Sequence, residues 1–265
     1  MASETLPRFR IEPSWFDAIA RRASRRRFDG RPLPPEAVER VDTVCRSVSE
    51  AAGGGVRAVL VNAAPQRVFK GLVGTYGAIT GAPAFVAFVG RTYWQVDVGF
   101  VGEAVILEAT AAGLDTCWIA GSFDAAAAAA QLEVADGAEV RAVTPLGYAP
   151  SEVRAGERLL HAVVKPRARL DLERIAPGVA SWPEWARDAA AAVRLAPSGQ
   201  NRQPWRLRME DGALVVACTT ERAYWTARID CGIAALHAEL GALHAGVRGT
   251  WTRLAEPDVA RFAPL

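Results

Sequence analysis

Hydrophobic residues along the chain follow two spacings, one typical of helices and the other typical of strands. Where apolar residues recur every three or four positions, as they do after Pro34 and Pro35, the pattern predicts a helix. Short runs rich in valine, isoleucine and phenylalanine predict strands. The segments expected to be helical are 14 into the run 21–27, 35–49, 98–112, 125–130, 184–195 and 232–244. The segments expected to be strands are 56–62, 84–89, 117–119, 140–148, 205–209, 214–218 and 247–254.

Local signals refine these elements. Ser14 followed by Asp17 predicts a capped start for the first helix. Asp211 and Gly212 between two strand segments predict a hairpin turn. The helix at 98–112 is apolar almost throughout, which predicts that it is buried in a core. Helices interleaved with mostly non-consecutive strands favour an α+β sandwich.

One 22-residue segment occurs twice. The stretch DVGFVGEAVILEATAAGLDTCW, from Asp97, aligns without a gap with DCGIAALHAELGALHAGVRGTW, which begins 133 residues later at Asp230. An offset of half the chain length indicates that one structural unit has been duplicated. The expected organisation is a first half at 1–150, a connector at 151–180 and a second half at 181–265. Such a chain can act as its own dimer. The identical pairs are Asp97/Asp230, Gly99/Gly232, Leu107/Leu240, Ala109/Ala242, Ala112/Ala245, Gly113/Gly246 and Trp118/Trp251.

Composition excludes several classes of protein. With 51% hydrophobic and 23% charged residues, the chain is typical of a globular protein with a sizeable core. It contains no apolar run of the roughly 18 residues that a membrane span requires, and its start has no apolar leader segment. The four cysteines and three histidines have no metal-ligand spacing, so we expect free thiols and no metal. A cytoplasmic protein is the simplest expectation.

Two polar segments are candidates for chemistry. The first, RASRRRFDGRP from Arg22, places arginines and a serine at a helix end, where they could hold a phosphate. A solvated basic face or a nucleic-acid patch is the alternative. The second, RLAPSGQNRQPW from Arg194, joins a helix to a strand through small and amide-bearing residues. It could contact a planar heterocycle or form a simple Asx-type turn.

These segments resemble the signatures RxSxRxFDxRP and APSxxNxQPW of the nitroreductase family, whose members depend on FMN and are normally homodimers. Residues 82–83, 116–121 and 146–148 resemble that family's later landmarks, in the same order. The layout is similar to the single-chain branch, the TM nitroreductases, in which two family-like halves are fused. The resemblance implies a nitroreductase-like α+β fold whose two similar halves form an intramolecular pseudodimer.

The two signatures are divided between the halves. The first half has the arginine-serine signature, but reads SEAAGGG from Ser49 where the second signature should follow. The second half has APSGQNRQPW, but lacks the arginine-serine signature before it. In the family's dimers, these signatures face each other across one flavin from different subunits. The resemblance therefore implies one composite site and the loss of its mirror copy.

The resemblance also implies roles for individual residues. The phosphate of FMN would be held by Arg22, Ser24, Lys165 and Arg167, with Arg26 directed to the pyrimidine edge of the ring. The ring would be lined by Trp118, Gly121, Pro197, Ser198, Gly199 and Asn201. Ala23 departs from the family's usual Arg or His, and the polar residue that follows the QPW strand has no counterpart. Trp118 can equally be a buried aromatic residue in a strand.

The function implied is an FMN-dependent oxidoreductase that passes electrons from NAD(P)H to a small aromatic or quinone-type acceptor. The alternative is a non-catalytic protein of the same fold that has lost flavin or binds another small ligand. Nucleic acid and membrane are not expected partners, because the remaining charge is balanced. The pseudodimer is expected to be monomeric or to form a further homo-oligomer.

Overall fold

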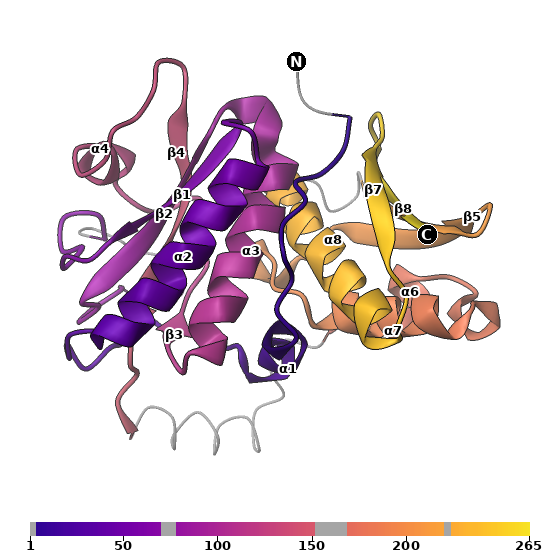
Figure 1. Cartoon of the computed structure of the whole chain (residues 1–265), viewed down its shortest axis with the longest axis horizontal. Helices are drawn as coiled ribbons and strands as arrows, with labels where there is room; N and C mark the ends of the chain where they lie inside the picture. The colour runs from indigo at the N-terminus through magenta and orange to yellow at the C-terminus, as the bar shows by residue number, and fades with distance from the viewer. Residues whose placement is uncertain (1–3, 70–77, 152–168, 220–223) are drawn as a thin grey trace.

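Two four-stranded sheets flank a central layer of helices in the computed structural model, which describes residues 4–69, 78–151, 169–219 and 224–265 (Figure 1). The first sheet has the order β1-β2-β4-β3 and the second has the order β5-β6-β8-β7. These orders are the same when each strand is matched with the one four places later. The first sheet contains β1 (Val56–Val61), β2 (Ala84–Gly90), β3 (Asp115–Thr116) and β4 (Glu139–Gly147). The second contains β5 (Trp205–Glu210), β6 (Ala213–Cys218), β7 (Gly249–Arg253) and β8 (Asp258–Pro264).

The helices repeat in the same way. In each half, one helix precedes the first strand and a longer, buried helix follows the second strand. The α-helices are α1 (Ser14–Arg21), α2 (Pro35–Ala51), α3 (Gln95–Ala111), α4 (Ala125–Ala129), α6 (Leu172–Ile175), α7 (Glu184–Leu195) and α8 (Ala227–His244). Short 3-10 turns lie at η1 (Thr92–Trp94), η2 (Val179–Ser181) and η3 (Gly199–Asn201). The α+β fold with two similar halves is thus confirmed, while the exact boundaries of the halves and connector stay a prediction.

Three local expectations were wrong. The helix α1 follows Pro13 and has no side-chain cap, so Ser14 does not begin it as expected. The strand expected at 117–119 lies at Asp115–Thr116, because the Cys117 amide leaves the ladder to donate to the Thr144 hydroxyl at 3.2 Å. The strand β8 was not expected at all. Its pattern is interrupted by alanines and ends in Pro264, and its pairing with β6 and β7 supplies what the pattern lacks.

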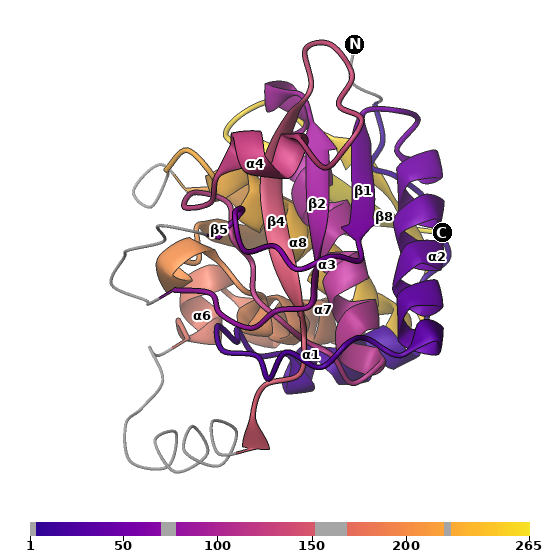
Figure 2. The ribbon, with the colours of Figure 1, turned by 90° about the vertical axis from the view of Figure 1, so that its left-hand side faces the viewer.

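The first sheet is covered on both faces (Figure 2). Alternate residues of β2 point to different clusters: Val86 and Phe88 join the main core with α3, whereas Phe85 and Ala87 join a smaller cluster with Ala128 of α4. Every residue of β2 is buried. This two-sided burial is the reason for its uninterrupted apolar sequence.

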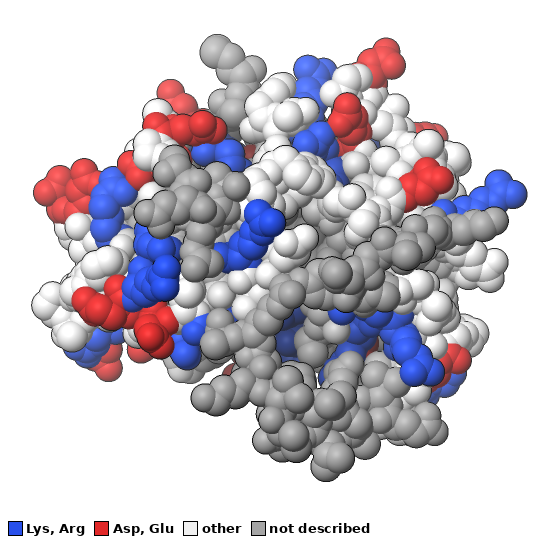
Figure 3. Space-filling view, turned by 180° about the vertical axis from the view of Figure 1, so that it is seen from behind, with Lys and Arg blue, Asp and Glu red and all other residues white. Residues whose placement is uncertain are grey.

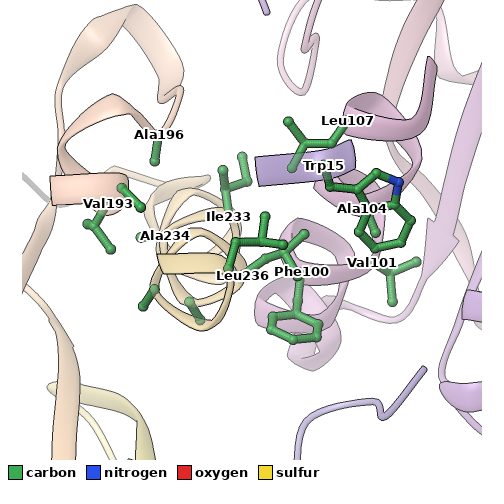
Figure 4. Packing of buried hydrophobic residues seen from close by; sticks show 14 of the residues in the cluster. Trp15, Phe100, Val101, Ala104, Leu107, Val193, Ala196, Ile233, Ala234 and Leu236 are labelled. Carbon is green, nitrogen blue, oxygen red and sulfur yellow. The ribbon is translucent and has the colours of Figure 1, made fainter. Parts of the chain in front are cut away.

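The helices α3 and α8 cross at the centre of the molecule, where the main core is packed (Figures 1 and 4). A Cβ placed on Gly99 would overlap the carbonyl oxygen of Ile229, and one placed on Gly232 would overlap that of Val96. Both members of each pair are related by the repeat offset of 133 residues. The crossing is therefore a pseudo-twofold contact in which backbone touches backbone, and glycine is required on both sides.

Membrane insertion finds no support in the helices. Within the described ranges, none is long and apolar enough to cross a bilayer.

Glu239 of α8 introduces a pH dependence. Its carboxyl accepts a hydrogen bond from Trp251 Nε1 at 3.0 Å. Burial raises the pKa of Glu239 from 4.5 to about 7, against the opposing effects of Trp251 and Arg8. Between these pH values the folded state keeps a proton that the unfolded state has released, so stability is lost as pH rises through about 7. We expect Glu239→Gln to raise Tm above that of the wild type at about pH 8, and to have little effect at about pH 5.

Thermal unfolding of both proteins at the two pH values measures this difference. Glu50→Gln, at an exposed position of α2, serves as the control. An equal gain from Glu239→Gln at both pH values would contradict the raised pKa.

Candidate functional site

The arginine-serine segment runs along the open edge of the first sheet. Ser24 pairs with Thr116 of β3, and the Arg25 amide donates to the Thr116 carbonyl at 2.8 Å. Further on, the Phe28 amide donates to Thr80 and the Asp29 amide donates to Tyr148, both at 2.8 Å. This path brings the segment beside the residues at 116–121 and 146–148 that the sequence had marked.

Three of the residues expected to bind phosphate or flavin gather around one thiol. Burial raises the pKa of Cys117, and Arg26, a hydrogen bond from Ser24 and Arg22 oppose that rise in this order. These effects act only at short range, so Arg22, Ser24 and Arg26 lie close together beside the end of β3.

Arg22 has an unsatisfied cationic group. Its Nε and Nη1 atoms are buried and have no hydrogen-bond partner. A buried, unpaired guanidinium is costly, so such a group indicates a place for an anion.

The second half brings a further arginine to the same place. Arg169 Nη1 donates to the Ala196 carbonyl at 2.6 Å and to Asn201 Oδ1 at 3.1 Å. Burial lowers the pKa of Arg169 to about 10, and the positive charges of Arg22 and Arg194 add to this effect. The arginine-serine segment of one half and the loop after α7 of the other therefore meet in one basic cluster, which we define as Arg22, Arg169 and Arg194.

Sequence reasoning did not identify Arg169. Lys165 and Arg167, which it chose instead, lie outside the described residues. The shared signal was the basic run KPRAR, but nothing in the run indicates which cation reaches the loop.

The loop between α7 and β5 is held in an unusual backbone conformation. Gln200, Asn201 and Gln203 have φ angles of 53°, 56° and 51°, in the left-handed region that residues other than glycine rarely adopt. The Ser198 hydroxyl accepts a hydrogen bond from the Gln203 amide at 2.9 Å. The Gly199 amide donates to Asp230 Oδ2 at 2.9 Å. Because such backbone strain persists only where the surroundings enforce it, the loop is a candidate for binding rather than a simple connection.

Two aromatic residues in front of α8 close around this loop. The Tyr224 hydroxyl contacts both the Gly199 carbonyl, at 3.2 Å, and the Asp230 carboxyl. Burial raises the pKa of Asp230 well above its usual value, although the Gly199 amide opposes this. Trp225 lies against Gly121 of the first half, where an added Cβ would be 3.0 Å from the ring. Gly121 therefore faces the second half, as the composite site requires.

Trp118 lies just after β3, half-buried rather than within a strand. Its ring packs against Gly102 of α3, where a Cβ would overlap it, and its centroid is 5.1 Å from that of Phe88. The indole Nε1 donates to Glu103 Oε2 at 2.6 Å. The ring is thus fixed on three sides.

The mirror copy of this region is filled by the protein's own side chains. Gly55 follows α2 as Gly199 follows α7, and an added Cβ on Gly55 would overlap the Trp94 ring. Asp97, the counterpart of Asp230, forms an ion pair with Arg253, whose guanidinium lies 5.5 Å from the Trp94 ring centre. The asymmetry of the two signatures is therefore matched by an asymmetry in packing.

Comparison with known proteins identifies the family. Residues 15–242 match the profile of the family described as "Putative TM nitroreductase". The chain belongs to this family. No curated protein matched the chain.

Among solved structures, the TM nitroreductase chain is similar to a putative nitroreductase (tm1586) from Thermotoga maritima MSB8. The TM-score is 0.61 at 21% identity, over 94% of this chain and 93% of that one, so the likeness shows a shared fold. A nitroreductase family protein from Streptococcus pneumoniae TIGR4 matches with a TM-score of 0.45 at 16% identity, over 61% of this chain and 98% of that one. An FMN-dependent nitroreductase from Clostridium difficile R20291 matches with a TM-score of 0.42 at 16% identity, over 51% and 87%.

Proposed function

We propose that this TM nitroreductase is an FMN-dependent oxidoreductase that carries electrons from NAD(P)H to a small aromatic or quinone-type acceptor. The buried, unpartnered guanidinium of Arg22 carries the proposal, because it lies beside Arg169 and Arg194 where an anion of the size of a phosphate would complete its bonding. Basic side chains also reach the surface around the middle of the face seen in Figure 3. Electrostatics of this kind favours an anionic nucleotide.

The residues of the site fit FMN in two parts. Arg22 and Ser24, with Lys165 and Arg167 from the undescribed segment, would hold the phosphate, and Arg26 would approach the pyrimidine edge. The strained loop would place backbone groups of Pro197, Ser198 and Gly199 along the ring, opposite Trp118 and Gly121. Bound FMN supplies the hydride chemistry in both directions.

The protein's own part is to bind, orient and exclude water. Asn201 Oδ1 accepts from Arg169, and the Ser198 hydroxyl accepts from within the loop, so both side chains preserve the shape of the binding surface. This division of labour requires no acid-base residue, and none is assigned. A pseudodimer that is monomeric, or that forms a further homo-oligomer, is compatible with a site built inside one chain.

Arg22→Ala tests the phosphate contact. A hydrogen bond to a charged group contributes about 1.5–3 kcal/mol, so its loss should weaken FMN binding by roughly 10- to 150-fold while the fold stays intact. Titration of the apoprotein with FMN, followed by flavin fluorescence, measures the change.

Arg21→Ala is the matched control, because Arg21 is exposed and its side chain contacts only the Asp17 carbonyl, at 3.4 Å. Equal FMN affinities of Arg22→Ala and the wild type would refute the phosphate contact. A colourless wild-type protein that takes up no added FMN would instead favour the non-catalytic alternative.

A further inference from the structure

A polar cluster lies inside the seam between the two halves. Its members are Glu103 of α3, His237 of α8 and Trp118, which follows β3. His237 Nε2 lies 2.9 Å from Glu103 Oε1, and Trp118 Nε1 donates to Glu103 Oε2 at 2.6 Å. Both Glu103 and His237 are completely buried. The cluster therefore connects the second half to the ring that the first half contributes to the site.

The hydrogen bonds fix where the protons are. His237 Nδ1 lies 3.0 Å from the Ala192 carbonyl, which can only accept, so Nδ1 carries a proton. The Trp118 indole always donates, so Glu103 Oε2 accepts. The contact between His237 Nε2 and Glu103 Oε1 then needs one more proton, which either atom can own. In both cases the pair is neutral overall and fully bonded.

The mirror positions contain no such cluster. The repeat offset of 133 residues places Leu236 opposite Glu103 and Ala104 opposite His237. Both are buried in the main core, where Figure 4 shows them with Phe100 and Ile233 at the crossing of α3 and α8. The crossing is thus packed with apolar residues on one side and polar ones on the other. Because buried polar pairs are weak stabilisers compared with apolar residues, packing alone does not account for the polar side.

The polar side is the one that carries the site. Trp118 follows Cys117, which is in contact with Ser24 of the arginine-serine segment. Glu103 also acts electrostatically on Arg169 and Asp230, which hold the loop after α7. On the other side, the mirror residue Trp251 donates to a different acid, Glu239.

We propose that Glu103 and His237 are positioning residues that fix the indole plane of Trp118 as a wall of the flavin site. The inference rests on the proposed function for the identity of the ligand, but the orientation of Trp118 is a property of the protein alone. The indole ring is wedged between Gly102 and Phe88, and the hydrogen bond to Glu103 selects one orientation within that space.

The decisive variant copies the mirror side. Glu103→Leu combined with His237→Ala installs the residue types found at 236 and 104, so the core keeps an apolar pairing that the same fold already contains. Glu103→Gln is the conservative partner, since its amide can accept from Trp118 and donate to a neutral His237. Circular dichroism of each variant checks the fold.

The first readout needs no ligand. In a ¹⁵N-labelled protein, the indole N–H resonance of Trp118, assigned with Trp118→Phe, should move upfield and broaden in the double variant, while that of Trp251 stays in place. Glu103→Gln should retain a single Trp118 resonance near the wild-type position. An unchanged Trp118 resonance in the double variant would overturn the inference, whether or not FMN binds.

The second readout is FMN affinity. The double variant should bind FMN about tenfold more weakly, and Glu103→Gln should recover most of that loss. A displaced Trp118 with unchanged FMN affinity would overturn the role in the site. Failure of the wild type to bind FMN would overturn the proposed function instead and leave the resonance test decisive. If the double variant does not fold, Trp118→Phe, which keeps a ring but lacks the donor, replaces it, and unchanged affinity there is equally fatal.

Discussion

His237→Ala is expected to destabilise the fold by about 3–5 kcal/mol. The substitution leaves the Glu103 carboxyl buried with only Trp118 as its partner, and it leaves the Ala192 carbonyl without its donor. Removing one member of a buried pair is far more damaging than replacing both, because the remaining group keeps its desolvation penalty. Chemical denaturation of the wild type and the variant gives the difference in the free energy of unfolding.

The rescue and the control make this prediction specific. Adding Glu103→Leu to His237→Ala should recover most of the lost stability, since no buried polar group then lacks a partner. His244→Ala is the control on the same helix. His244 is half-buried and stacks on Phe16 with a centroid distance of 3.8 Å, so its loss should cost only about 1 kcal/mol. A double variant less stable than His237→Ala would refute the explanation.

Gly99→Ala and Gly232→Ala should each destabilise the protein by about 3 kcal/mol. Alanine is the better helix former by about 1 kcal/mol, so the expected sign is opposite to that of helix propensity. The reason is that each new methyl group would overlap a carbonyl oxygen of the facing helix. Ser47→Ala, at an exposed position of α2, controls for the effect of an added or lost small side chain.

The pseudo-twofold contact adds a second condition to this prediction. Gly99 meets Ile229 as Gly232 meets Val96, so the two variants should lose similar free energies of unfolding. The double variant should lose less than the sum, because one displacement of the helices relieves both overlaps. If one glycine tolerated alanine and the other did not, the crossing would not be symmetric.

Much of the fold was predictable because it depends on local pattern. The apolar runs at 84–89 and 98–112 indicated elements buried on all sides, and β2 and α3 are buried in that way. Asp211 and Gly212 both have positive φ angles, as the hairpin prediction required. The repeat led to the two halves, although it could not indicate that Gly99 and Gly232 mark their contact.

The site was predictable only as far as signatures reach. Arg22, Ser24 and Arg26 lie together, and the loop at 197–201 faces them from the other half. Arg169, Tyr224 and Asp230 escaped notice because their importance arises from contacts with the Ala196 carbonyl and Gly199, which lie 25 to 31 residues away in the chain. No spacing rule connects residues across such distances. The alternative of a buried Trp118 was partly right, since its ring is packed on Gly102.

The backbone contact at Gly99 and Gly232 also limits how the molecule can move. Proteins that close around a ligand by domain motion need a hinge or a layer of side chains that can slide. Where two helices touch without intervening side chains, neither motion is available, so the halves behave as a single rigid block at this crossing. A nucleotide and the molecules that react with it must then enter and leave past the rim, through rearrangement of loops, while the central frame stays fixed.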